Sequence, residues 1–270
     1  MEQVVANRER SAKPGSIVLD LDGVLYVDSH GVPGSAAALE ELSRLGFQLV
    51  FATNNSTKTP ESVVAHLMER IGFAADPEAI VTSGMATARF LAADLPRVLL
   101  LGPPALGATL RDEGIELTSD WRQADAIVSG LDLDLSYRRL ADAVLAVGRG
   151  ARFIATNVDN TYPTPEGLYP GGGAIAAAVT VATGVEPEVC GKPHEPMRSL
   201  VRAMIGDGPV WVVGDRPETD LEMGAAEGWT RVLVLTGVTS GRDVRDGVAD
   251  VVLDTIANLP EFLAEGLSNR

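Results

Sequence analysis

The stretch I-V-L-D-L-D-G-V-L at residues 17–25 decides the fold. Its first three residues are apolar and uncharged, which is typical of a strand buried on both faces of a parallel sheet. Two carboxylates, Asp20 and Asp22, end the strand, and Gly23 then allows a turn and a close approach of a ligand. Because buried carboxylates are costly unless they are paired or bound to metal, we expect a divalent cation. A plain Asp-Gly turn is the alternative that this stretch leaves open.

Strand-like and helix-like segments alternate along the rest of the chain, which predicts a parallel α/β architecture. Thr59 and Pro60 are a cap and a first residue typical of a helix, and Gly72 is a typical stop. Residues 156–173 are expected to form a long polar loop. The block after Pro96 is itself α/β and could form its own core, so we predict three segments: 1–96, 97–186 and 187–270.

Composition excludes several classes of partner. The chain has 270 residues and a net charge of −15, which argues against nucleic acid or an anionic membrane as the main partner. Its one cysteine, Cys190, allows no internal disulfide and is interpreted as a small buried apolar residue. Residues 1–16 lack the apolar core of a signal peptide, so we expect a soluble, cytoplasmic protein.

Polar clusters follow three of the buried-type strands. In open parallel sheets ligands bind at the carboxyl ends of strands, so these clusters would meet if the strands are neighbours. Carboxylates favour a hard cation such as Mg²⁺, whereas a hydroxyl, backbone N–H groups and a lysine favour an oxyanion such as phosphate. Metal and phosphate together indicate phosphoryl transfer, and the residues concerned are Asp20, Asp22, Thr53, Asn54, Asn55, Lys192, Asp215 and Asp220.

Four motifs in order, D-L-D-G-V, T-N-N, G-K-P and G-D-R-P-E-T-D, resemble those of the haloacid dehalogenase (HAD) superfamily of phosphatases. The long insertion between the second and third motifs is similar to its C2-capped (type IIA) branch, the NagD-like and 4-nitrophenylphosphatase-like group. The resemblance covers about residues 15–265. It implies a Rossmann-like, doubly wound core sheet with an inserted α/β C2 cap domain.

The resemblance also implies roles for the motif residues. Asp20 would be the nucleophile that forms an aspartyl-phosphate, and Asp22 the general acid and then the base. Mg²⁺ would be held by the Asp20 carboxylate, the Asp22 backbone carbonyl and Asp215.

Further residues would bind phosphate or support the metal. The Thr53 hydroxyl and the N–H groups of Asn54 and Asn55 would hold phosphoryl oxygens, and Lys192 would neutralise charge. Asp220 would hold Lys192 or the metal waters; a helix N-terminal charge is the alternative.

The loop A-T-N-V-D-N-T-Y-P resembles the part of the family's cap that faces the core, which implies substrate-specificity roles for Asn157, Asp159 and above all Tyr162. Turn formation is the alternative for Asn157 and Asp159.

The three histidines show no metal-ligand spacing. His66 is expected on a helix surface and His30 in a loop; His194, close to Lys192, is a weaker candidate to line the site. Arg216 is interpreted as an ion-pair partner of its neighbour Asp215.

The expected function is Mg²⁺-dependent hydrolysis of small phosphate monoesters. Candidates are glycerol phosphate, sugar phosphates, phosphoglycolate, pyridoxal phosphate and nucleoside monophosphates. A phosphonatase would need a cap lysine, and residues 97–186 contain none. A phosphomutase stays open as an alternative, as does a non-catalytic sensor or scaffold on the same fold. By analogy with relatives, we expect a homodimer through the cap.

Overall fold

The apolar residues that open the deciding stretch form β1 (Ser16–Leu19), which is buried throughout. The protein is represented by a computed structural model that describes residues 14–164, 166–241 and 244–268. β1 lies inside a six-stranded sheet of order β15-β14-β13-β1-β4-β5, and every pairing in it is parallel. The other strands are β4 (Gln48–Thr53), β5 (Ile80–Thr82), β13 (Val210–Gly214), β14 (Thr230–Val234) and β15 (Val251–Leu253).

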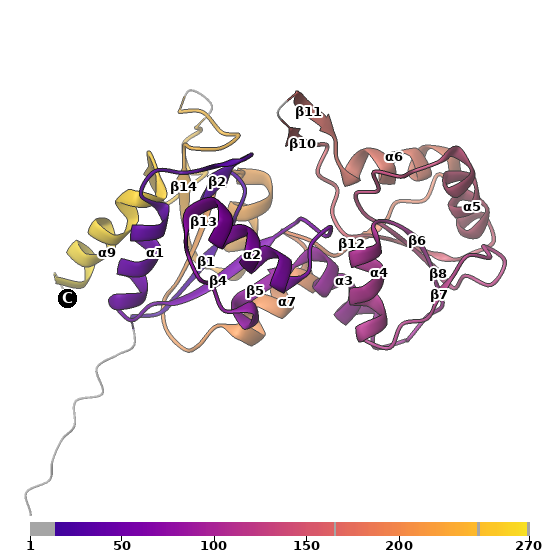
Figure 1. Cartoon of the computed structure of the whole chain (residues 1–270), viewed down its shortest axis with the longest axis horizontal. Helices are drawn as coiled ribbons and strands as arrows, with labels where there is room; N and C mark the ends of the chain where they lie inside the picture. Colours follow the sequence, from indigo (N-terminus) through magenta and orange to yellow (C-terminus); the bar gives the residue numbers. More distant parts are fainter. Residues whose placement is uncertain (1–13, 165, 242–243, 269–270) are drawn as a thin grey trace, which may run out of the picture.

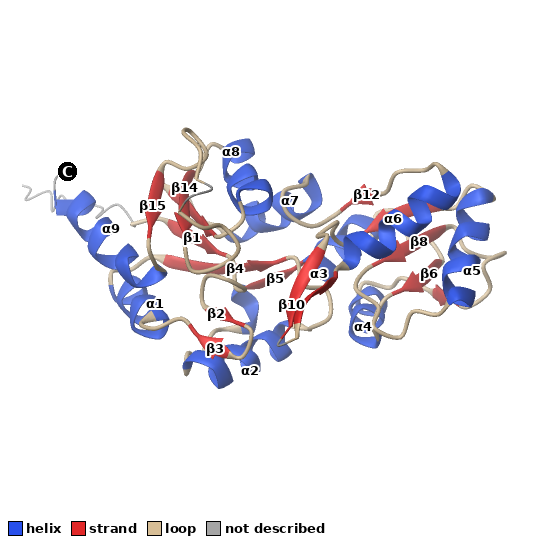
Figure 2. Cartoon of the chain, turned by 90° about the horizontal axis from the view of Figure 1, so that it is seen from above, coloured by secondary structure: helices blue, strands red, loops and turns tan. Residues whose placement is uncertain are grey.

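Helices cover both faces of this sheet (Figures 1 and 2). Successive strand residues point to opposite faces, so Ile17 and Leu19 join one apolar cluster and Val18 joins another. The first cluster includes side chains of α1 (Ser35–Arg44), α2 (Pro60–Ile71) and α9 (Leu259–Ser268). The second includes side chains of α3 (Ser83–Leu91), α7 (Glu195–Met204) and α8 (Glu222–Glu227). The predicted doubly wound parallel sheet is therefore confirmed.

A second α/β unit lies beside the first (Figure 1). Its sheet has the order β12-β9-β8-β6-β7 and is again parallel, with strands β6 (Val98–Leu101), β7 (Leu117–Thr118), β8 (Ala126–Ser129), β9 (Arg152–Ala155) and β12 (Glu188–Val189). One face packs on α5 (Tyr137–Gly148) and α6 (Gly172–Thr183), and the other on α4 (Pro104–Asp112).

The two units share one helix layer. α3 contributes Ala86 to the core of the first sheet, and Ala88 and Leu91 to the cluster that holds α4. Cys190 is buried in that same cluster, so its interpretation as a buried apolar residue is confirmed. β12 is paired with the second sheet, although the predicted division at residue 187 assigns it to the last segment. The three predicted segments stay a prediction.

Two short hairpins were not expected from the sequence. The predicted loop at 156–173 contains β10 (Thr161–Thr164) and β11 (Gly167–Pro170), in which Tyr162 lies opposite Tyr169. The rings stack edge to face, and such a cross-strand pair stabilises a hairpin that turn-rich sequence obscures. β2 (Tyr26–Val27) and β3 (His30–Gly31) form the other hairpin, directly after the two carboxylates.

Three short helical pieces are also found among the described residues: η1 (Pro77–Ala79), η2 (Pro217–Leu221) and η3 (Ile256–Asn258). The predicted ends of α2 are confirmed, because the Thr59 side chain accepts the Ser62 N–H and Gly72 is left-handed. No helix in the part of the chain that the structure describes is long and apolar enough to cross a membrane.

Candidate active site

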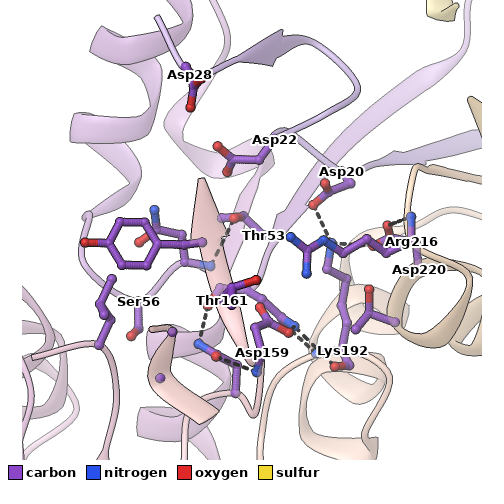
Figure 3. A pocket seen from close by; sticks show the side chains of 18 residues that line it. Asp20, Asp22, Asp28, Thr53, Ser56, Asp159, Thr161, Lys192, Arg216 and Asp220 are labelled. Carbon is purple, nitrogen blue, oxygen red and sulfur yellow. Dashed lines mark hydrogen bonds and ion pairs between the residues drawn. The ribbon is translucent and has the colours of Figure 1, made fainter. Parts of the chain in front are cut away.

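The carboxyl ends of β1, β4 and β13 meet at one edge of the six-stranded sheet, as the strand order requires. A cavity of about 230 Å³ opens there, and Figure 3 shows side chains from both units around it. The β10–β11 hairpin contributes to its wall, so the second unit covers the site. The predicted residues that line the cavity are Asp20, Asp22, Thr53, Asn54, Asn55, Asn157, Asp159, Tyr162, Lys192 and Asp220.

Lys192 is the buried cation of the site, with 4% of its surface exposed. Its Nζ lies 2.5 Å from Asp20 Oδ1 and 2.7 Å from Asp220 Oδ1, and donates to the Ala52 carbonyl at 2.8 Å. Burial alone would lower the pKa of Lys192, but the two carboxylates raise it above its usual value. The ammonium is therefore held charged, and all three of its N–H bonds are used.

Negative charge exceeds positive charge around this lysine. Ligand oxygens of Asp20, Asp215 and Asp220 all lie within 4.8 Å of one another. Burial raises the pKa of Asp215 to about 6, and the charge of Asp220 adds to the effect. Asp215 Oδ1 is buried without a hydrogen-bond partner among the described residues. An orphaned buried carboxylate oxygen beside other carboxylates is a donor set that suits a hard divalent cation.

The loop after β14 fixes Asp215, a contact that the sequence analysis missed. The Val238 N–H donates to Asp215 Oδ2 at 2.6 Å, and the Thr239 hydroxyl donates to the Asp215 carbonyl at 2.6 Å. A Cβ on Gly23 or on Gly237 would lie 2.4 or 2.0 Å from Asp215 Oδ2, so glycine is needed at both places. The signal available in the sequence was that β14 also ends at this edge of the sheet.

Asn54 joins three separate segments of the site. Its Oδ1 accepts the Lys192 N–H at 2.7 Å, and its Nδ2 donates to Asp159 Oδ1 at 3.2 Å. Its backbone carbonyl accepts from Asn157 Nδ2 at 2.8 Å and from the Ser83 hydroxyl at 2.6 Å. Asn157 also accepts the Asp159 N–H, so its side chain holds the cap loop to the core.

Gly191→Ala is expected to damage this junction. The added Cβ would lie 2.5 Å from Asn54 Oδ1 and 2.5 Å from the Thr156 carbonyl, so Asn54 and the Lys192 loop must move apart. We expect a loss of about 1–3 kcal/mol in the free energy of unfolding, as for other overpacked sites. Urea denaturation measures this, with Gly148→Ala as the control.

A Cβ on Gly148 meets nothing within 4 Å, at the end of α5. Alanine there is expected to leave stability equal or slightly raised, since it is the better helix former. Equal stability of Gly191→Ala and the parent chain would contradict the tight junction.

Thr53 and Asn55 are coupled through the backbone. The Asn55 N–H donates to the Thr53 hydroxyl at 3.1 Å, which leaves the hydroxyl proton of Thr53 free to donate into the cavity. The Asn55 side chain instead accepts from the N–H of Thr57 at 2.8 Å and so shapes the loop.

Burial raises the pKa of Asp22, which favours its protonated form. The positive charges of Lys58, Lys192 and Arg216 oppose this rise.

The structure corrects the predictions for His66 and Arg216, and it does not bear out His194, the weaker candidate. His66 is only partly exposed, because its ring packs edge to face on Tyr26 at 4.9 Å. His194 is an exposed residue at the start of α7 and is not part of the cavity wall. Arg216 lines the cavity, and its guanidinium has no ion pair with Asp215.

One further residue lines the cavity that the sequence did not indicate. This is Asp28, a turn residue with a φ of 52° between β2 and β3. His30, which was expected in a loop, lies in β3.

A doubly wound core that brings carboxylates, a hydroxyl and a buried lysine together under a second α/β unit defines a capped phosphoryl-transfer hydrolase. Family models agree: residues 17–116 match one described as haloacid dehalogenase-like hydrolase, and residues 189–259 match a HAD-hydrolase-like one. The acid sugar phosphatase of Staphylococcus aureus is 38% identical over 235 residues, which are 85% of this chain and 89% of the relative.

Solved structures agree as well. Glycerol phosphate phosphatase from Mycobacterium tuberculosis, in complex with calcium, is 35% identical with a TM-score of 0.83, covering 90% of this chain and 74% of that one. The p-nitrophenyl phosphatase from Archaeoglobus fulgidus is 31% identical with a TM-score of 0.85, covering 92% and 98%. This chain belongs to the haloacid dehalogenase-like hydrolases, in the NagD-like branch, and is a small-molecule phosphatase.

Proposed function

We propose that the chain is a Mg²⁺-dependent phosphomonoesterase for small phosphorylated metabolites, acting through an aspartyl-phosphate. The observation that carries the proposal is the Asp20–Lys192–Asp220 arrangement beside Asp215, at the floor of the small cavity. The relatives named above, a sugar phosphatase and a glycerol phosphate phosphatase, support substrates of this size.

Asp20 is the proposed nucleophile. An Asp20 carboxylate oxygen forms a bond to phosphorus while the bond from phosphorus to the leaving oxygen breaks. Asp22, whose pKa is raised by burial, gives its proton to that oxygen. In the second half Asp22 takes a proton from water, which attacks phosphorus and releases phosphate from Asp20. Lys192 and the Thr53 hydroxyl hold the negative oxygens throughout.

The proposed metal ligands are the carboxylates of Asp20 and Asp215 and the backbone carbonyl of Asp22. When bound, the cation supplies charge that offsets the repulsion between the Asp20 carboxylate and the phosphate. Asp220 is proposed as a support that keeps Lys192 in place through their 2.7 Å ion pair. The unpartnered Asp215 Oδ1 supports the assignment of Asp215.

The direct test is a panel of phosphate esters assayed with and without Mg²⁺. Hydrolysis of 4-nitrophenyl phosphate and of several small esters is expected with Mg²⁺ and lost in EDTA, and returning Mg²⁺ should restore it. Release of free phosphate distinguishes hydrolysis from transfer within one molecule, the phosphomutase alternative. A panel with no turnover at all, using folded protein, would overturn the proposed function.

Metal binding is expected to weaken in acid. With burial and Asp220 placing the pKa of Asp215 at about 6, a proton competes with the cation below that pH. The apparent Mg²⁺ affinity should therefore fall by up to about tenfold per pH unit below about pH 6. Calorimetric titration at pH 5, 6 and 7 and constant ionic strength measures this. An affinity that stays constant over that range would contradict the raised pKa.

Assembly through the cap is also a proposal. Exposed apolar side chains on the second unit, such as Leu133, Tyr137 and Val181, support a homodimer formed by this part of the chain. Sedimentation velocity on the full chain tests this. A single monomer boundary across a concentration series would count against it.

A further inference from the structure

Arg216 brings an unpaired cation to the cavity. It follows Asp215 at the end of β13, is half-buried, and Figure 3 shows its side chain reaching in from the same side as Asp220. Its backbone N–H donates to Asp220 Oδ2 at 3.2 Å, but its guanidinium has no hydrogen bond or ion pair within the described parts of the chain. Five N–H donors are thus held at the cavity wall without a partner.

Asp159 brings a half-used carboxylate to the same cavity from the cap loop. Oδ1 accepts from Asn54, whereas Oδ2 has no hydrogen-bond partner among the residues described. Burial raises the pKa of Asp159, and the charge of Arg216 is the largest influence that lowers it again. The two side chains therefore affect each other electrostatically although they form no ion pair within 4.0 Å.

We propose that Asp159 and Arg216 form a subsite for a hydroxyl-bearing leaving group, one that carries adjacent alcohols next to the phosphoester. This rests on the proposed function and narrows its substrate class. One substrate hydroxyl donates to Asp159 Oδ2, and its neighbour accepts from the Arg216 guanidinium. A hydroxyl is the group that satisfies both, since it donates and accepts. Thr161, in the same wall, adds a further hydroxyl.

Other leaving groups fit this pair less well. A second anionic group could accept from Arg216 but would be repelled by Asp159, and it has no proton to donate to Asp159 Oδ2. An apolar group would cover both side chains and leave their polar atoms without partners, which costs free energy. The opposite charges of Asp159 and Arg216 balance, so the subsite favours a neutral, polar leaving group.

The test compares glycerol 3-phosphate with n-propyl phosphate, which has the same carbon chain without the two alcohols. The parent enzyme with Mg²⁺ is expected to prefer glycerol 3-phosphate by about 10- to 100-fold in kcat/KM, in keeping with hydrogen bonds to charged groups. Asp159→Asn and Arg216→Gln should each lower that preference about tenfold, since only the polyol substrate loses a hydrogen bond. Arg138→Gln, on the exposed face of α5, is the matched control and should keep the preference.

Inhibition by inorganic phosphate is the second measurement, because phosphate carries no alcohol. Its inhibition constant is expected to change far less than the preference does. If the phosphate inhibition constant of Arg216→Gln rises by the same factor as its substrate preference falls, Arg216 instead binds the phosphate group. If both variants lose kcat/KM equally on the two esters, the pair instead positions the cap. Preference for 3-phosphoglycerate over glycerol 3-phosphate would also overturn the inference. Absence of turnover on every ester overturns the proposed function, whereas turnover without preference overturns this inference alone.

Discussion

Asp20→Asn is expected to lower kcat at least about a thousandfold, because asparagine keeps the shape of the side chain but is a poor nucleophile toward phosphorus. Asp20 directly follows β1 and its Oδ1 contacts Lys192 Nζ, so the neutral amide also removes a counter-charge from the buried ammonium. Steady-state hydrolysis of 4-nitrophenyl phosphate with Mg²⁺ measures the loss. Rapid acid quench should also find phosphoenzyme in the parent and none in the variant.

The matched control is Asp207→Asn, which removes an exposed carboxylate from the loop after α7. It should keep parental kcat and KM. Parental kcat in Asp20→Asn would show that another group attacks phosphorus, and the assignment of the nucleophile would then be wrong. A thermal unfolding scan separates loss of chemistry from loss of fold.

Lys192→Met is expected to be the most destabilising single change at the site, and it should also abolish turnover. Methionine has a similar length but leaves Asp20 and Asp220 facing each other without a counter-charge and the Ala52 carbonyl without its donor. Breaking a buried ion pair in this way typically costs about 3–5 kcal/mol of the free energy of unfolding. Urea denaturation in EDTA at pH 7 measures the loss without a contribution from bound metal.

Lys58→Met is the control for this experiment. Lys58 is partly buried near Asp22 and makes no ion pair within 4.0 Å among the described residues, so its loss should cost less than about 1 kcal/mol. If the two lysine variants unfold at the same urea concentration, Lys192 does not hold the two carboxylates as described. Retained stability with lost turnover would instead limit Lys192 to the chemistry.

Local sequence was sufficient for the elements that bear the chemistry. Three buried strands each lead into a polar cluster. β1 is followed by Asp20, β4 ends in Thr53 of the T-N-N cluster, and β13 ends in Gly214, which opens the G-D-R-P-E-T-D run. Parallel strands present their carboxyl ends at one edge, so the meeting of these clusters could be predicted before any contact was known. The helix caps at Thr59 and Gly72 were also predictable, because a cap depends only on neighbours within one helical turn.

Contacts that depend on strand pairing or on how loops fold back were not predictable in this way. Sequence periodicity carries no signal for the pairing of Tyr162 with Tyr169, so it predicts only a loop over residues 156–173. Nearness in sequence favours an ion pair between Arg216 and Asp215, whereas the Arg216 side chain lines the cavity instead. The hold of Val238 and Thr239 on Asp215 also depends on a loop 23 or 24 residues away. Each depends on which strand lies beside which.

The sequence by itself determined the strand that ends in Asp20 and Asp22 and the chemistry that two such carboxylates imply, because that information lies within nine residues. The tertiary structure alone decided how this chemistry is controlled. It brings Lys192 to Asp20 across 172 positions, and it brings Asp159 of the cap loop to Asn54 of the core across 105. Those contacts follow from the packing of one sheet's edge beneath a second unit, which only the folded chain contains.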